Sequence, residues 1–181
     1  DRVCDARKAL CRRANLSWYA RVACYFDVLA AVAGMREFKT LHAQGFHVAL
    51  PAEVWNAYVG DWCDMDAFYR SLCRAYGACR AKGYEALEEP VRSALEWAEN
   101  LYSGWFLAES NACWTNAAQA QWLDSGCISG VDRQRDFFWK IMPACKGSAK
   151  TMVVIVSDAL RFEVGREIAD ELEREKGGMV K

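Results

Sequence analysis

The stretch TMVVIVSDALRFEVGRE, residues 151–167, decides the fold class, because the period of the apolar residues changes within it. Five of the six residues 151–156 are β-branched, and such a continuous apolar run is typical of a strand buried on both faces of a parallel sheet. Apolar residues at steps of four then predict a helix through Leu160, Val164, Ile168 and Leu172. Strand and helix together are typical of the first β-α unit of an α/β domain.

The chain before this unit is predicted to be helical. We expect a helix that ends near Gly34, a segment that begins at Pro51, a helix capped by Asp64, a longer helix from Pro90 and a short helix that ends near Pro143. The expected inner faces are Trp18, Val22, Tyr25, Leu29 and Val32; Met65, Phe68, Leu72 and Tyr76; Leu87, Val91, Ala94, Ala98, Leu101 and Trp105; and Phe137, Phe138 and Ile141. The predicted fold class is therefore mainly α, with a helical domain over 1–145.

Charge and hydropathy exclude several classes of function. Lys and Arg number 23 against 24 Asp and Glu, so the chain lacks an overall cationic field for nucleic acid or anionic lipid. Asp1 and Asp5 interleave with the basic cluster Arg2, Arg7, Lys8, Arg12 and Arg13, and a solvated helix face explains this cluster better than nucleic-acid contacts. No apolar run approaches the roughly 20 residues that span a bilayer. The eight tryptophans fall mainly at helix-core spacing, so we expect core packing or a helix-docking groove rather than base stacking.

The nine cysteines indicate a reducing compartment. Their number is odd, and no two have the CxxC spacing of a zinc or redox site, so they are expected to act as small buried hydrophobes. The chain opens without a signal peptide or an initiator Met, which predicts a cytoplasmic location and a fragment at the N-terminus. His42 and His47 are five residues apart, on different helix faces, which argues against a local zinc site.

Ser157 and Asp158 follow the predicted strand directly. Ligands of open α/β sheets bind at the carboxyl ends of the strands, where an ionised Asp is a common metal ligand. The same side chains could instead cap the following helix by accepting hydrogen bonds from its free N–H groups. The residues alone leave both interpretations open.

The segment SDALRFE, residues 157–163, with the apolar run before it and the helix after it, resembles the opening motif of the PglZ domain. The close resemblance covers roughly 25 residues; looser similarity to the helical region before that domain includes residues 105–107 and 134–138. Members of the PglZ family resemble the alkaline phosphatase superfamily and belong to BREX bacteriophage-defence systems. The resemblance implies that residues 151–181 are the truncated start of an alkaline-phosphatase-like α/β domain, preceded by a helical linker or interaction region over 1–145.

The resemblance also implies chemistry at Asp158, which matches the first metal-binding Asp of alkaline-phosphatase-like enzymes. Two divalent ions, usually zinc, would bridge a phosphate mono- or diester in the parent protein. The nucleophile and remaining ligands should lie beyond the chain end, because the 23 residues after Asp158 contain no Ser, Thr or His. The fragment itself is therefore expected to be inactive. Other BREX components are the implied partners, with no membrane and no direct nucleic-acid contact by this region.

Two further motif residues have open roles. Arg161 could contact a phosphate or pair with a carboxylate, and we expect the carboxylate. Glu163 has no assigned chemistry. A different class of function also remains: a helical protein–protein interaction module without catalysis, with the β-α unit only at its edge. Such a module would bind its partner without metal, and Asp158→Ala would leave that binding unchanged.

Overall fold

The computed structural model describes residue 12 and residues 16–145 and 153–176. Its elements in these ranges are helical, and they include two π-helical segments, η1 and η2, and one 3₁₀ turn, η3. In chain order they are α2 (Tyr19–Leu41), α3 (Pro51–Ala57), η1 (Tyr58–Trp62), α4 (Cys63–Lys82), α5 (Glu85–Glu99), η2 (Asn100–Leu107), α6 (Ala108–Ser125), η3 (Gln134–Asp136), α7 (Phe137–Cys145) and α8 (Phe162–Lys176). The prediction of a mainly α fold is confirmed.

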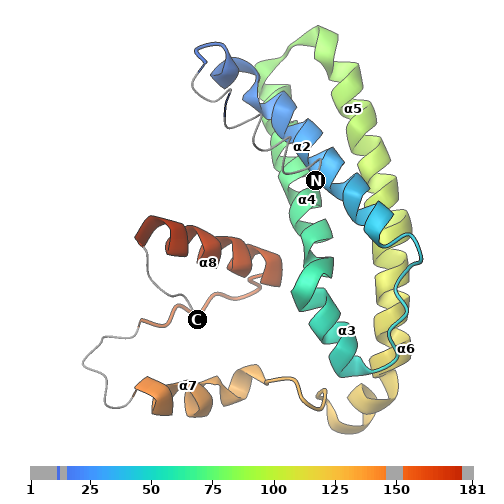
Figure 1. Ribbon diagram of the computed structural model, residues 1–181, viewed down its shortest axis with the longest axis vertical. Helices are drawn as coiled ribbons and strands as arrows, with labels where there is room; N and C mark the ends of the chain where they lie inside the picture. Colours follow the sequence, from blue (N-terminus) through green and yellow to red (C-terminus); the bar gives the residue numbers. More distant parts are fainter. Residues whose placement is uncertain (1–11, 13–15, 146–152, 177–181) are drawn as a thin grey trace.

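Two long helical runs form the body of the molecule. The first consists of α3, η1 and α4, the second of α5, η2 and α6, and α2 packs against α4 (Figure 1). Gly83 links the two runs with a left-handed backbone (φ 66°), which a glycine adopts without steric cost. The largest fully buried side chains between the helices are Phe106, Met35, Met65, Leu72 and Cys63. This three-helix arrangement supplies the surface on which the C-terminal motif rests.

Helix α2 does not end at Gly34, so the predicted stop was wrong. The helix continues to Leu41, and a Cβ at Gly34 would lie only 2.6 Å from Cε1 of Phe68 on α4. The glycine therefore allows close packing rather than chain termination. The predicted inner face was also wrong in part, because Leu29 is 63% exposed. The buried residues of α2 are Cys24, Val28, Ala31, Gly34, Met35 and Phe38.

The other helix starts agree with the sequence to different degrees. Pro51 opens α3 as predicted, since proline lacks the N–H that a first turn leaves unused. Asp64 caps nothing, because α4 continues directly from η1 and Asp64 lies inside its first turn. Helix α5 begins at Glu85, five residues before the predicted start at Pro90. The short helix α7 confirms the last prediction, with Pro143 inside it.

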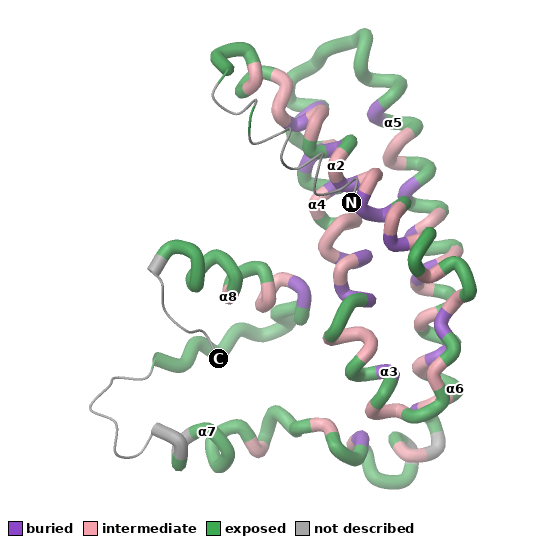
Figure 2. Tube along the Cα trace, viewed as in Figure 1, coloured by how far each residue is buried: buried purple, intermediate pink, exposed green. Residues whose placement is uncertain are grey.

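The predicted strand is not formed in the described part of the chain. Residues 151 and 152 lie outside that part, and residues 153–157 have no regular secondary structure. Val153, Ile155 and Val156 are 78%, 87% and 80% exposed, and Figure 2 shows this segment and most of α7 as exposed. A strand needs a neighbouring strand for its backbone N–H and C=O groups, and none lies among the described residues. Helix α8 confirms the helical half of the unit.

The tryptophans correct another expectation. Trp62 is 5% exposed and lies in the core, but a majority of the eight are exposed. The exposed ones are Trp18, Trp55, Trp97, Trp122 and Trp139. Spacing on one helix face therefore did not identify which tryptophans are covered, because the neighbouring helices cover only part of each face.

The cysteines and hydropathy agree better with the sequence. Cys24, Cys63, Cys79 and Cys113 are buried free thiols, as expected of small apolar residues, while Cys73 is exposed. None of the helices in the described ranges has the length and apolar character needed to cross a membrane.

Candidate functional site

Asp158 lies on a turn between the irregular segment and α8. The next residue, Ala159, has a left-handed backbone (φ 56°), which costs a residue with a Cβ roughly 1–2 kcal/mol. Helix α8 begins only at Phe162, and the backbone oxygen of Arg161 accepts its first hydrogen bonds, from the N–H groups of Val164 and Gly165. Within the described residues, neither Ser157 nor Asp158 caps the helix. The Asp158 side chain is exposed and is therefore available to a ligand.

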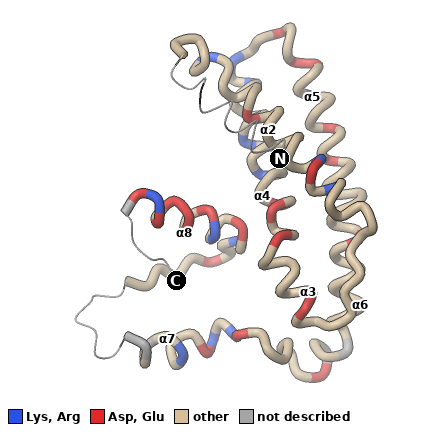
Figure 3. The backbone as a smooth tube through the Cα atoms, viewed as in Figure 1, with Lys and Arg blue, Asp and Glu red and all other residues tan. Residues whose placement is uncertain are grey.

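Glu163 ties the motif to the helical body. Its carboxylate is 2% exposed and accepts a hydrogen bond from Nη2 of Arg70 on α4. A buried carboxylate requires such a partner, because it has lost its hydration. One turn later Arg166 pairs with Asp64, also on α4. Two ion pairs therefore fix α8 on α4; α8 supplies the acidic residue in the first pair and the basic residue in the second. Figure 3 shows both signs of charge along α8.

A second buried carboxylate, Asp66, lies on α4 close to this contact. It is 8% exposed, and its two oxygens accept hydrogen bonds from the hydroxyls of Tyr58 (2.8 Å) and Tyr102 (2.6 Å). Burial, followed by the hydrogen bond to Asp66, raises the pKa of both tyrosines well above the usual value. Both hydroxyls therefore keep their protons and remain donors. This triad was missed at the sequence level.

The two tyrosines belong to the two π-helical segments. Tyr58 lies in η1 and Tyr102 in η2, and these segments face each other across Asp66. π-Helical segments are rare and often occur at functional sites. Here the wider turn places aromatic side chains around an open cavity of about 420 Å³. Its lining comprises Val54, Trp55, Tyr58, Trp62, Asp66, Tyr102, Phe106, Leu107, Ser110, Asn111, Trp114 and Arg161.

The motif reaches this cavity through two more of its residues. The Phe162 ring lies 6.2 Å from the Tyr58 ring, centroid to centroid, and Arg161 lines the cavity. Among the described residues Arg161 forms no ion pair, so the carboxylate that we expected beside it is not one of them. Three successive motif residues, Arg161, Phe162 and Glu163, thus adjoin the helical body.

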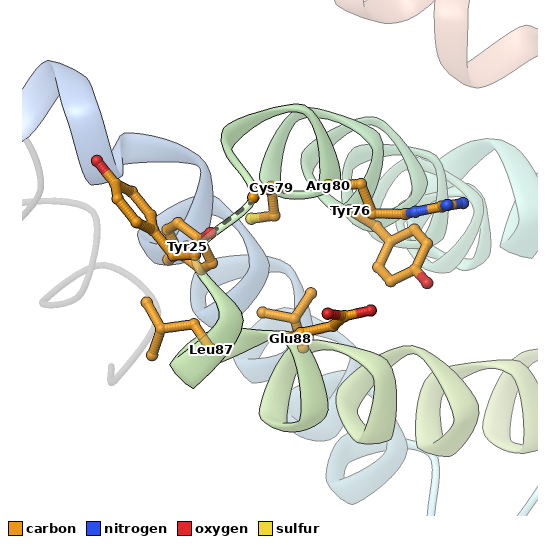
Figure 4. Close-up of a pocket in the computed structure, with 9 residues that line it drawn as sticks. Tyr25, Tyr76, Cys79, Arg80, Leu87 and Glu88 are labelled. Carbon is orange, nitrogen blue, oxygen red and sulfur yellow. Dashed lines mark hydrogen bonds between the residues drawn. The ribbon is translucent and has the colours of Figure 1, made fainter.

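The remaining candidates stand apart from the motif. His42 lies 3.2 Å from Asp61, Nε2 to Oδ2, and stacks on Phe46, with no metal-binding group of three or more His, Cys, Asp or Glu side chains in the described ranges. A smaller cavity of about 170 Å³ lies at the other end of α4, where the Tyr25 hydroxyl donates to the backbone oxygen of Cys79 at 3.4 Å (Figure 4). Neither feature adjoins Asp158.

Two relatives are similar to nearly the whole chain. An alkaline phosphatase-like protein BrxZ of Escherichia coli O9:H4 (strain HS) is 30% identical over 176 residues, 94% of this chain. An alkaline phosphatase-like protein PglZ of Bacillus cereus (strain H3081.97) is 23% identical over 167 residues, 91% of this chain. The chain spans 20% and 18% of the length of these curated relatives. No family model and no solved structure matches.

The similarity extends far beyond the motif that suggested it. It includes the helical body, which carries Asp66 and the cavity, as well as residues 157–163. Both relatives bear the same alkaline phosphatase-like description, which agrees with the resemblance of residues 157–163 to the PglZ motif. Over the length that it covers, the chain is therefore similar to alkaline phosphatase-like proteins of the PglZ family.

Proposed function

We propose that the chain is part of a bacteriophage-defence protein of the BREX type that hydrolyses phosphate mono- or diesters with divalent metal ions. The similarity to two alkaline phosphatase-like proteins supports this proposal, together with the position of Asp158 directly after an apolar segment and before α8. In this proposal residues 151–181 begin the α/β domain, and its first strand forms when residues 153–156 gain a neighbouring strand. The helical region over 1–145 holds that start in place.

Asp158 fits one ligand position of a divalent metal. Its carboxylate is exposed and forms no ion pair within the described residues, and carboxylate oxygens are common ligands of zinc and magnesium. A complete centre requires ligands from outside those residues. A metal pair, when bound, would stabilise charge on the attacking and leaving oxygens of the ester. The chain's own contribution is to orient Asp158 through α8, which Arg70 and Asp64 hold on α4.

The position of Asp158 carries this proposal, and a metal measurement tests it. In the full-length protein, Asp158→Asn should lower both the bound zinc, measured by elemental analysis, and the hydrolysis of p-nitrophenyl phosphate and bis(p-nitrophenyl) phosphate. Asp124→Asn, a change of another exposed Asp on α6, should alter neither. Unchanged metal content in Asp158→Asn would overturn the ligand role.

A second function, a protein–protein interaction module, is favoured by the exposed apolar surface of α7. Phe138 and Trp139 are 54% and 76% exposed, and α7 and residues 154–160 line an open cavity of about 570 Å³. We propose other defence components as partners. Binding to them should survive EDTA and Asp158→Ala, and Trp139→Ala should weaken it. Loss of binding on chelation would contradict the module.

A further inference from the structure

The cavity between η1, η2 and α6 combines aromatic walls with the guanidinium of Arg161 in its lining. Trp55 is 43% exposed, and Trp114 is half-buried, so both offer ring surface to a bound molecule. Asp66 accepts the hydrogen bond of the Tyr58 hydroxyl, so this half-buried tyrosine presents its ring rather than its polar tip. The Tyr102 ring is buried and stacks on Tyr69 and Phe106. The volume of about 420 Å³ falls within the range of small-molecule sites, roughly 300–1,000 Å³.

Polar groups in the cavity select an anionic, planar ligand. Arg161 is exposed and forms no ion pair within the described residues, and its planar guanidinium matches a phosphate in two parallel hydrogen bonds. The Asn111 amide, also on the lining, offers a donor and an acceptor side by side, the pattern that pairs with the edge of a nucleobase. A cationic ligand would be repelled by Arg161, and the negative charge of Asp66 lies behind two hydroxyl donors.

We propose that this cavity binds a nucleotide, with its base against the tryptophan rings and the ring of Tyr58 and its phosphate on Arg161. Stacking of one base on aromatic side chains contributes about 1–3 kcal/mol and tolerates different bases. The expectation against nucleic-acid contacts rested on overall charge, on the interrupted basic cluster and on the core spacing of the tryptophans. This site needs only one cation and a stacking surface, which the exposed Trp55 helps to supply. It requires no metal, so it is independent of the proposed hydrolysis.

Binding is measured by calorimetry on the 181-residue chain in EDTA. Adenosine 5′-monophosphate should bind with one-to-one stoichiometry, adenosine about tenfold more weakly, and ribose 5-phosphate without saturation. A tenfold difference corresponds to about 1.4 kcal/mol, a reasonable value for one charge-assisted contact. Phosphotyrosine should bind at least tenfold more weakly than the nucleotide. Equal binding of phosphotyrosine, or no binding of the nucleotide, would overturn the proposal.

Variants locate the site. Arg161→Ala should reduce the affinity for adenosine 5′-monophosphate about tenfold and leave that for adenosine unchanged, because only the phosphate contact is lost. Arg80→Ala changes an exposed arginine at the smaller cavity and should alter neither affinity. Trp114→Ala should reduce both at least tenfold, whereas Trp122→Ala, on the same helix but outside the cavity, should not. Equal effects of Arg161→Ala and Arg80→Ala would overturn the assignment.

The same ligand chemistry can come from a free nucleotide or from the end of a strand. An octanucleotide with a 5′-phosphate that binds at least tenfold more tightly than the mononucleotide would assign the site to strand ends. Equal affinity would assign it to free nucleotides. Both results support the cavity as a nucleotide site, provided that Arg161→Ala lowers the affinity for the octanucleotide and for the mononucleotide. Circular dichroism of each variant confirms that the helices are retained.

Discussion

The contact between α2 and α4 gives a sharp test of the packing, because two glycines in helices differ only in their surroundings. A Cβ at Gly34 would lie 2.6, 2.7 and 2.9 Å from three ring atoms of Phe68, whereas a Cβ at Gly77 on α4 would meet nothing within 4 Å. Both positions are inside helices, so replacement with alanine gains about 1 kcal/mol of helix propensity at each. Only Gly34→Ala adds a steric clash.

The clash sets the size of the difference. Overpacking of this kind costs about 1–3 kcal/mol, since the Phe68 ring must shift within a packed interface. Gly77→Ala should therefore raise the free energy of unfolding by about 1 kcal/mol. The free energy of unfolding of Gly34→Ala should be about 1–3 kcal/mol lower than that of Gly77→Ala. In a chain of this size, each kcal/mol corresponds to roughly 2–4 °C in Tm.

Urea denaturation of the 181-residue chain, followed by circular dichroism, measures the difference. Addition of Phe68→Ala to each glycine variant is the matched control, because it removes the ring. In the Phe68→Ala background, Gly34→Ala and Gly77→Ala should raise the free energy of unfolding by the same amount. Equal stabilisation by the two single variants would refute the close approach of α2 and α4, and with it the reason given for Gly34.

Three further predictions concern the contacts around the motif and the core. Glu163→Gln should lower the protection of α8 amides from hydrogen exchange by about 1–3 kcal/mol, because it removes the charge that faces Arg70, whereas Glu167→Gln on the exposed side should not. Tyr102→Phe should cost about 1–3 kcal/mol in urea denaturation, since one oxygen of the buried Asp66 loses its donor; a cost equal to that of Tyr76→Phe would contradict the triad. Burial raises the pKa of the Cys63 thiol to about 11 from 9.0, so the folded state holds that proton more tightly than the unfolded state. The stabilisation is complete below pH 9 and is lost as the pH rises towards 11; the slope of stability against pH over this range should be shallower in Cys63→Ala, and an unchanged slope would contradict the shift.

The helical content was predictable because it rests on local signals, while helix ends and faces depended on neighbours. Proline favours the first turn of a helix whatever its neighbours in the fold, and Pro51 opens α3 in this way. The apolar spacing of residues 87–105 likewise predicted a helix without knowledge of the helices that pack against it. Gly34 had the sequence character of a helix stop, yet only the ring of Phe68, 34 residues later, explains it. Leu29 fitted the predicted face of α2 and is exposed because no described helix covers it.

The residues of the candidate site likewise differ in whether a local sequence pattern points to them. Asp158 was predictable, since an acidic residue after an apolar run is a local pattern, and its ligand role remains a prediction. Asp66, in contrast, is one carboxylate among many along helices, and its partners Tyr58 and Tyr102 lie 8 residues before it and 36 after it. Apolar residues on both sides of an Asp in a helix would have been a hint of burial. The hydroxyls that make the burial possible had no sequence signal.

The arrangement of the motif explains why it extends beyond its acidic residue. Asp158 is the one motif residue that we propose as a metal ligand. Arg161, Phe162 and Glu163 adjoin the helical body instead: the first lines the cavity, the second lies near Tyr58, and the third pairs with Arg70. We therefore expect a change at Arg70 or Tyr58 to alter the orientation of the turn at Asp158. The similarity to the two relatives includes both the motif and the helical body. Helix α4 is therefore a structural support of the motif.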